Sequence, residues 1–197
     1  MPHIIRYLFL SVLALSLTVF SNAQEEEKAS KETIKEQKQW EKEKKKLEKE
    51  IEKDRLAELS RLMIEYHRFV LEADFLSNKN GYRIPVSPII NFIRIDSAEC
   101  TLQVGSAFSV GYNGVGGSTA VGRVIKYEYE KTGKKGDNYQ VNMTLMTNVG
   151  TYDVFMNVSR DGFADANIRG NWSGQLNYHG KLIPVSLSKV FRGTPGY

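Results

Sequence analysis

The sequence has 197 residues, of which 41% are hydrophobic, so it holds one domain's worth of core-forming residues. Its 27 basic and 23 acidic residues give a net charge of +4, and the basic residues are spread along the chain instead of forming a stripe between aromatic residues. This distribution argues against a nucleic-acid binder, and the single cysteine, Cys100, excludes an internal disulfide and a metal site built from thiolates.

Residues 1–23 have the build of a secretory signal peptide. A basic start that ends at Arg6 precedes an apolar run over residues 7–20, and Ser21 and Ala23 provide the small residues of a cleavage site. The apolar run is shorter than the roughly 20 residues that a membrane span needs. We therefore expect cleavage after Ala23, a periplasmic or secreted location in a Gram-negative envelope, and no transmembrane span after cleavage.

Residues 24–66 are rich in Glu and Lys and contain neither Gly nor Pro, which predicts a long charged helix. Opposite charges three or four residues apart, such as Arg61 and Glu65, support it. Apolar residues are thinly spaced in the first half but form a stripe from Leu56 to Tyr66. We expect the second half to be packed and the first half to be a solvated helix or tether. A coiled coil is the alternative, which the broken heptad pattern disfavours.

From His67 onward, apolar residues recur at every second position, which is the period of a strand. The clearest run covers residues 138–184, where Val141 and Val154 take the inward phase of two of four successive strands. Short links with Gly and Asn or Asp predict tight hairpins and therefore antiparallel neighbours. The expected fold class is mainly β: an antiparallel meander of about eight or nine strands over residues 67–197, closing as a barrel or a sandwich behind the helix.

Two earlier strands show the same period. In the strand that follows the helix, Phe75 takes an inward phase. In a later strand, Arg123 falls on the apolar phase of Ile125 and Tyr127, where an unpaired charge would be costly. A bulge near Gly122, or a side chain at the rim of a barrel, is favoured over an anion-binding role for this arginine.

Residues 106–118 form a long glycine-rich connection between strands. A dinucleotide-binding motif would need a glycine where Thr119 stands, and the segment leads into a strand instead of a helix. We interpret it as a connection whose exposed part is a candidate ligand or partner surface, together with the next strand. This candidate surface consists of Tyr112, Asn113, Gly114, Gly116, Gly117, Arg123 and Tyr127.

The chain shows no pattern typical of a catalytic, cofactor or metal site. His67 and His179 remain after cleavage, and neither has a partner at metal-ligand spacing. Asp153 and Asp165 take outward phases, where carboxylates are solubility charges. We expect Cys100 to be a small buried hydrophobic residue. The prediction is a protein without catalytic activity, cofactor or metal.

Several stretches of the β region match a known pattern. They are Arg68 to Asp74, Asn91 to Asp96, Gly114 to Gly117, Gly162 to Ala164, and Gly180 to Pro184 together with Val190 to Gly193. Through them the chain resembles an uncharacterised family of exported Gram-negative proteins, domain of unknown function 4251. The resemblance covers roughly residues 67–193 and implies an envelope location. It supplies no catalytic residues.

Three functions remain open. The first and favoured one is a binding or interaction module that reaches an envelope protein or a glycan through the glycine-rich loop or the helix. The third is a hydrolytic enzyme, which would need a cleft that gathers Asp153, His179 or Arg123.

The second is a lipocalin-like carrier of a small apolar ligand, because the interior of an eight-stranded barrel is just wide enough to hold one. It predicts an internal cavity lined by Tyr127, Met143, Tyr152 and Met156.

Overall fold

The computed structural model describes residues 35–106, 108, 111, 113–133, 136–170 and 175–196. The expected signal peptide, the start of the expected helix and Tyr112 lie outside the described residues. The chain divides into two compact units, Met1–Ile51 and Glu52–Tyr197. Among the described residues, no helix is long and apolar enough to cross a membrane.

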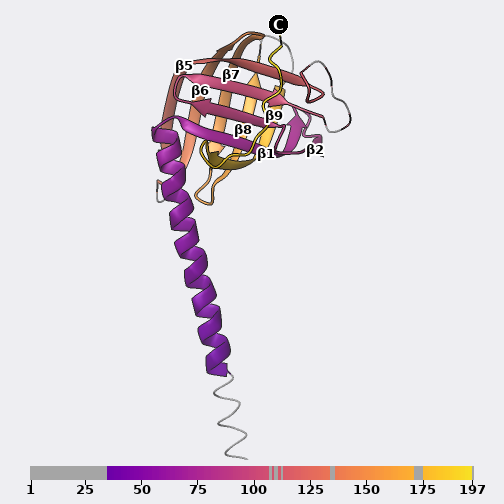
Figure 1. The fold of residues 1–197 in the computed structure, drawn as a ribbon. Coiled ribbons are helices and arrows are strands. Elements are labelled where there is room, and N and C mark those ends of the chain that lie inside the picture. Colours follow the sequence, from indigo (N-terminus) through magenta and orange to yellow (C-terminus); the bar gives the residue numbers. More distant parts are fainter. Residues whose placement is uncertain are drawn as a thin grey trace, which may run out of the picture. The chain divides into compact units, whose positions relative to one another are not determined.

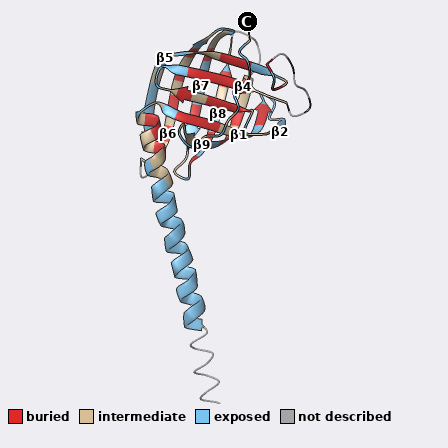
Figure 2. Ribbon diagram, in the orientation of Figure 1, coloured by how far each residue is buried: buried red, intermediate tan, exposed pale blue. Residues whose placement is uncertain are grey.

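A helix runs over residues 35–65. Its first part is exposed at every residue to position 55, including the large apolar side chains of Trp40, Leu47 and Ile51. Its last turns are different, because Met63 and Ile64 are buried in the core of the second unit (Figure 2). The second half is thus packed against the core, as expected, and the described part of the first half is exposed in the single chain.

Nine strands follow the helix. They are β1 (Arg68–Asn78), β2 (Arg83–Pro85), β3 (Phe92–Asp96), β4 (Glu99–Val104), β5 (Ser118–Thr132), β6 (Asn138–Thr147), β7 (Gly150–Val158), β8 (Phe163–Arg169) and β9 (Gln175–Pro184).

All neighbouring strands are antiparallel, and their order is β2-β1-β3-β4-β5-β6-β7-β8-β9, with β1 also paired to β9. This last pairing closes eight strands into a barrel and leaves β2 as an extra strand on β1 (Figure 1). The predicted fold class is confirmed, and the choice between barrel and sandwich falls on the barrel.

Alternation along the strands sorts the side chains as the sequence predicts. Val141 and Val154 are 0% and 2% exposed, whereas Asp153 is exposed on the outer wall. The inward side chains of the other strands join these two valines in one continuous apolar cluster. The barrel therefore has an apolar interior, and its outer wall is exposed or half-buried over β6 to β8.

A bulge in β5 corrects the expected phase of that strand. The register between β5 and β6 shifts between Val124 and Lys126, so Ile125 is 50% exposed while Val124 packs against the core. Arg123 consequently lies on the outer wall. A bulge is present, as expected, but it lies three residues beyond Gly122 because its position is set by the pairing with β6.

A second bulge corrects the phase of β1. Its register with β9 shifts between Ala73 and Phe75. This shift resets the alternation of inward and outward side chains, so Phe75 is 37% exposed and the next residue, Leu76, is 4% exposed. Phe75 was expected to face the core, and that prediction is wrong.

The helix closes one end of the barrel. Leu59, Met63 and Ile64 pack against the core at the end where β1 begins and β5 ends. The phenol of Tyr127 donates a hydrogen bond to the backbone oxygen of Ile64 (3.0 Å). Arg160, in the β7–β8 turn, forms an ion pair with Asp54 of the helix. This end is thus filled by side chains from outside the sheet.

The segment after β9 crosses the outer wall of β4 and β5 and is tied there by Gln103, which is fully buried. The Gln103 side-chain amide donates to the backbone oxygens of Ile90 (3.1 Å) and Phe191 (2.8 Å). Its Oε1 accepts hydrogen bonds from the Thr119 hydroxyl (3.1 Å) and the Gly193 amide (2.8 Å). One side chain therefore joins four separate stretches of the chain.

Candidate functional site

The end of the barrel opposite the helix contains an apolar pocket, here called the mouth pocket. Its volume is about 210 Å³. It is lined by side chains of five strands, β4, β5, β7, β8 and β9, at their mouth ends: Leu102, Val104, Ser118, Ala120, Tyr152, Ile168, Leu176 and Tyr178. The strand alternation that fills the rest of the barrel leaves this space open.

Tyr178 is a fixed part of the mouth pocket. It is 1% exposed, and its phenol donates a hydrogen bond to the backbone oxygen of Gln103 (2.9 Å). Burial raises the pKa of Tyr178 well above its usual range, so the phenol stays neutral. The wall at this point is therefore apolar apart from a satisfied hydroxyl.

The pocket differs in place from the cavity that the sequence predicts. Of the four residues expected to line a cavity, only Tyr152 lines this one. Met143 and Met156 are 2% and 0% exposed and belong to the core, and Tyr127 lies toward the helix end. Flexible methionine side chains fill the middle of the barrel, which leaves space only at the mouth.

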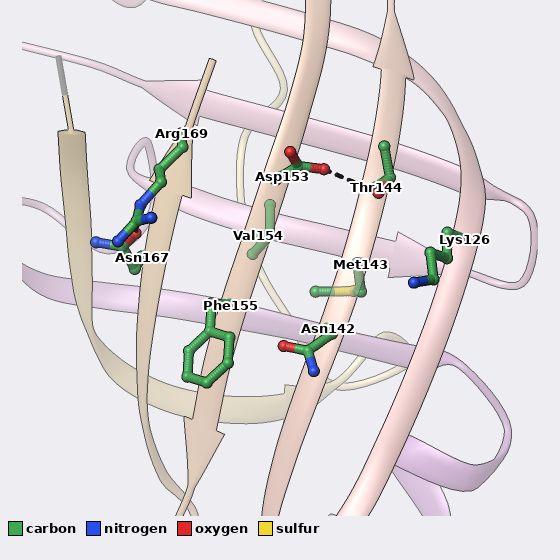
Figure 3. Close-up of a pocket in the computed structure, with 9 residues that line it drawn as sticks. All are labelled: Lys126, Asn142, Met143, Thr144, Asp153, Val154, Phe155, Asn167 and Arg169. Carbon is green, nitrogen blue, oxygen red and sulfur yellow. Dashed lines mark hydrogen bonds between the residues drawn. The ribbon is translucent and has the colours of Figure 1, made fainter. Parts of the chain in front are cut away.

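A second hollow of about 510 Å³, here called the outer hollow, lies on the outer wall (Figure 3). It is lined by Lys126, Asn142, Met143, Thr144, Asp153, Val154, Phe155, Asn167 and Arg169, from β5 to β8.

Figure 3 shows Lys126 and Arg169 on opposite sides of the outer hollow, with Asp153 and Phe155 between them. The Thr144 hydroxyl donates to Asp153 (2.9 Å), and Phe155 is 41% exposed. An exposed ring among amides and charges offers an apolar contact beside groups that donate and accept hydrogen bonds.

Within the candidate surface, Asn113 has a structural role. It is 6% exposed, and its Nδ2 donates to the Thr119 hydroxyl (3.1 Å). Its Oδ1 accepts hydrogen bonds from the amides of Val115 and Gly117, both at 3.2 Å. A Cβ at Gly117 would overlap the backbone oxygen of Val104. This part of the loop is held against the barrel by its own bonds.

The glycines of that surface share the loop of Asn113, whereas Arg123 and Tyr127 do not lie beside it. Gly114 and Gly116 adopt positive φ angles of 75° and 69°, which glycine tolerates and other residues do not. Arg123 lies on the outer wall, with its guanidinium 3.8 Å from the sulfur of Met146. Tyr127 faces the helix end. The structure therefore places these residues in three different environments.

Sequence reasoning missed a row of polar contacts on the outer wall. His179 on β9 lies between Asp165 on β8 and Ser77 on β1. Its Nδ1 is 2.6 Å from Asp165 Oδ1, and its Nε2 is 2.8 Å from Ser77 Oγ. Asp165, and not Asp153, is thus the carboxylate beside His179. No local pattern predicts this set, because the closure of β1 on β9 is what brings Ser77 to His179.

The other titratable groups are less suited to catalysis or metal binding. Cys100 is 2% exposed, as expected, and burial raises the pKa of its thiol to about 11, so the thiolate is scarce. His67 stacks on Tyr127 with ring centroids 3.7 Å apart, and burial lowers its pKa. Among the described residues, no group of three His, Cys, Asp or Glu side chains is placed to hold a metal ion.

Comparison with known proteins connects this barrel to one family. The family model for domain of unknown function DUF4251 matches residues 50–182. The chain is also similar to the crystal structure of a DUF4251 family protein from Bacteroides eggerthii, with 25% sequence identity and a TM-score of 0.59. That match covers 70% of this chain and 93% of the other. No curated protein matches. The chain therefore belongs to the DUF4251 family.

Proposed function

We propose that this domain is an exported binding module that takes a small apolar group into the mouth of its barrel. The observation that carries the proposal is the mouth pocket, with its volume of about 210 Å³ and its wall of aliphatic and aromatic side chains. Barrel mouths are among the places where ligand sites concentrate. The export part of the proposal is supported by the signal-like pattern of residues 1–23.

The asymmetry of the barrel supports this assignment. At the helix end, Ile64 and Met63 fill the interior, and in the middle Met143 and Met156 do so. At the mouth, Ala120 and Ser118 are small and leave room. A barrel of eight strands either fills its interior with side chains or holds one small ligand. In this barrel, side chains fill the interior over most of its length, and the mouth end has room for one small ligand.

The size of the pocket limits the ligand. An apolar cavity of about 150 Å³ stays dry and takes up benzene. The mouth pocket is somewhat larger, so it fits one or two fused rings or a short alkyl chain. A larger ligand would leave its remaining part in solvent beside Ser118, which is exposed at the rim.

The test uses indole and benzene as probes, with binding followed by NMR shifts of the mature protein. We expect both probes to shift the signals of Ala120 and Ile168. Ala120→Leu fills the pocket, so it should abolish these shifts while the thermal midpoint stays the same or rises. Met146→Leu changes an exposed side chain of the outer wall and serves as the matched control. Failure of both probes to bind at millimolar concentration, or unchanged binding in Ala120→Leu, would contradict the proposal.

The outer hollow favours a second candidate function, recognition of a glycan. Phe155 offers a ring face, and Asn142 offers an amide that both donates and accepts hydrogen bonds, as sugar hydroxyls require. Phe155→Ala should then lower the affinity for an envelope polysaccharide at least tenfold. Phe163→Ala, at another exposed ring of the outer wall, should not. Equal effects of the two substitutions would exclude this hollow as the site.

A further inference from the structure

The row of Ser77, His179 and Asp165 on the outer wall has the hydrogen-bond pattern of a nucleophile, a base and an orienting acid. Each ring nitrogen of His179 has one partner: Asp165 Oδ1 at 2.6 Å from Nδ1 and Ser77 Oγ at 2.8 Å from Nε2. These are the nitrogens that face the acid and the nucleophile in known triads. The three side chains come from β8, β9 and β1, so rigid strands fix their positions.

The amide of Asn177 is the other side-chain partner of Ser77 in this row. Its Oδ1 accepts hydrogen bonds from Asn167 Nδ2 (2.5 Å) and Gln175 Nε2 (3.0 Å). Its Nδ2 must therefore be the group that faces Ser77 Oγ, at 3.2 Å. Ser77 Oγ accepts from this amide and keeps its own hydrogen to donate, and the same Nδ2 also faces the Asn78 backbone oxygen at 3.5 Å.

The carboxylate of Asp165 fixes the proton positions of the neutral imidazole. A carboxylate only accepts, so the ring proton is on Nδ1 and is donated to Asp165, which leaves Nε2 to accept the Ser77 hydrogen. This tautomer has the lone pair of Nε2 directed at the serine hydroxyl. It is the state in which a histidine can act as a general base toward serine.

We propose that Ser77 and His179, positioned by Asp165, hydrolyse short-chain carboxylic esters. Ser77 Oγ attacks the ester carbonyl carbon while its proton moves to His179 Nε2, and the π electrons of the carbonyl move to its oxygen. The tetrahedral intermediate collapses, the C–O bond to the alcohol breaks, and Nε2 returns the proton to the leaving oxygen. Water then attacks the Ser77 acyl ester with His179 as base, which releases the carboxylic acid and regenerates Ser77.

The surroundings limit the substrate to a small acyl group. Ser77 is 7% exposed, and among the described residues it lines neither the mouth pocket nor the outer hollow. The apolar side chain beside it is Phe75, which pairs with His179 across the strands and carries the Arg83 guanidinium 4.0 Å from its ring centroid. One ring edge suits an acetyl group better than a long acyl chain. This activity is independent of ligand uptake at the mouth.

The inference departs from the expectation of a protein without catalytic activity. That expectation treated His179 as a solvated or locally hydrogen-bonded side chain and Asp165 as a solubility charge, since the sequence alone does not place Ser77 near either of them. Closure of the barrel supplies the missing neighbour. Asp165 is a positioning residue here, because it touches only His179 in this row.

A fluorophosphonate probe on the mature, full-length protein tests the proposal. We expect a covalent adduct at Ser77, located by peptide mapping, and turnover of p-nitrophenyl acetate faster than that of p-nitrophenyl octanoate. Ser77→Ala should abolish both adduct and turnover, and His179→Ala should lower turnover at least 100-fold. Asp165→Asn should lower kcat with little change in KM, which a merely structural loss would not do. Ser186→Ala, at an exposed serine after β9, is the matched control.

The adduct is mapped on the protein without substitutions, so this part of the test does not depend on whether any variant folds. Absence of an adduct at Ser77 under conditions that label a known serine esterase would overturn the proposal. Labelling that survives in folded His179→Ala would overturn it as well, because the serine would then react without its base. Mouth-pocket variants such as Ala120→Leu should retain turnover, so failure of one proposal leaves the other standing.

Discussion

The two ends of the barrel are built from the same alternating strands but finish differently. At the helix end, Leu59, Met63 and Ile64 enter from outside the sheet and complete the core. At the mouth end, Ala120 and Leu176 border a space of about 210 Å³ that no described side chain fills. The comparison shows that alternation along strands makes a wall, whereas a segment outside the strands decides whether an end is closed.

The ends also differ in the kind of bond that secures them. The helix end depends on buried apolar side chains, with the Tyr127 bond to Ile64 as a polar addition. The wall near the mouth depends on Gln103, whose bonds hold the C-terminal segment. We therefore expect the stability of the helix end to depend mainly on apolar volume and that of the mouth end mainly on hydrogen bonds.

Truncation of Ile64 should give the largest effect. Ile64 is 0% exposed at the closed end, so Ile64→Ala should lower the free energy of unfolding by about 2–5 kcal/mol. Chemical denaturation measures the change. Ile51→Ala, on the same helix at a residue 59% exposed, is the control and should cost less than about 0.5 kcal/mol. Equal costs at the two positions would show that the helix does not close the barrel.

Loss of the Gln103 amide should come next. Gln103→Leu leaves the Gly193 amide and the Phe191 carbonyl without their buried partner, which should cost about 2–3 kcal/mol. Hydrogen exchange should report faster exchange at Gly193, while the amides of β6 and β7 keep their protection. Gln175→Leu, at a half-buried amide on the outer wall, is the comparison. Uniformly faster exchange would mean that the segment is not held locally.

Truncation at the open end should cost less than truncation at the closed end. Leu176 is partly buried and already borders the mouth pocket, so Leu176→Ala enlarges an existing space instead of creating a new one. We expect a loss of roughly 1 kcal/mol, measured by the same denaturation series. A loss as large as that of Ile64→Ala would mean that the mouth is packed like the core.

The pH dependence of stability should give the smallest effect. Burial raises the pKa of Cys100 from 9.0 to about 11 and also raises the pKa values of Tyr127, at the helix end, and Tyr178, at the mouth. The folded state then keeps protons that the unfolded chain has lost, so stability is fully present below about pH 9 and falls as the pH rises further. Tyr127→Phe should make the fall shallower. A stability that stays flat through the ordinary range of tyrosine ionisation would contradict this assignment.

The parts of the fold that depend on neighbouring residues could be predicted from the sequence. In β6 and β7, alternation and a tight turn lie within one hairpin, so Val141 and Val154 are assigned inward without knowledge of any other strand. The bulges at Ile125 and before Phe75 could not be predicted in this way. Each is a mismatch with a partner strand, and for β1 that partner is β9, about 100 residues later.

The candidate sites depend even more on distant contacts. The cavity was expected among Met143 and Met156, but side-chain volumes fill that region and leave the mouth open instead. Asn113 was expected to be available to a ligand, but its amide is used by Thr119 and the loop. No sequence pattern marks Ser77 as functional, because its hydroxyl contacts His179 only when the barrel is closed.

The bonds of Gln103 also constrain when the chain can finish folding. Gln103 is made roughly midway through synthesis, yet one of its acceptor bonds comes from the amide of Gly193. A ribosome that has not reached codon 193 carries a chain in which this buried amide oxygen lacks one of its donors. Premature stop codons in the last stretch of the message should therefore be as damaging as many substitutions inside the strands, although they remove no strand at all.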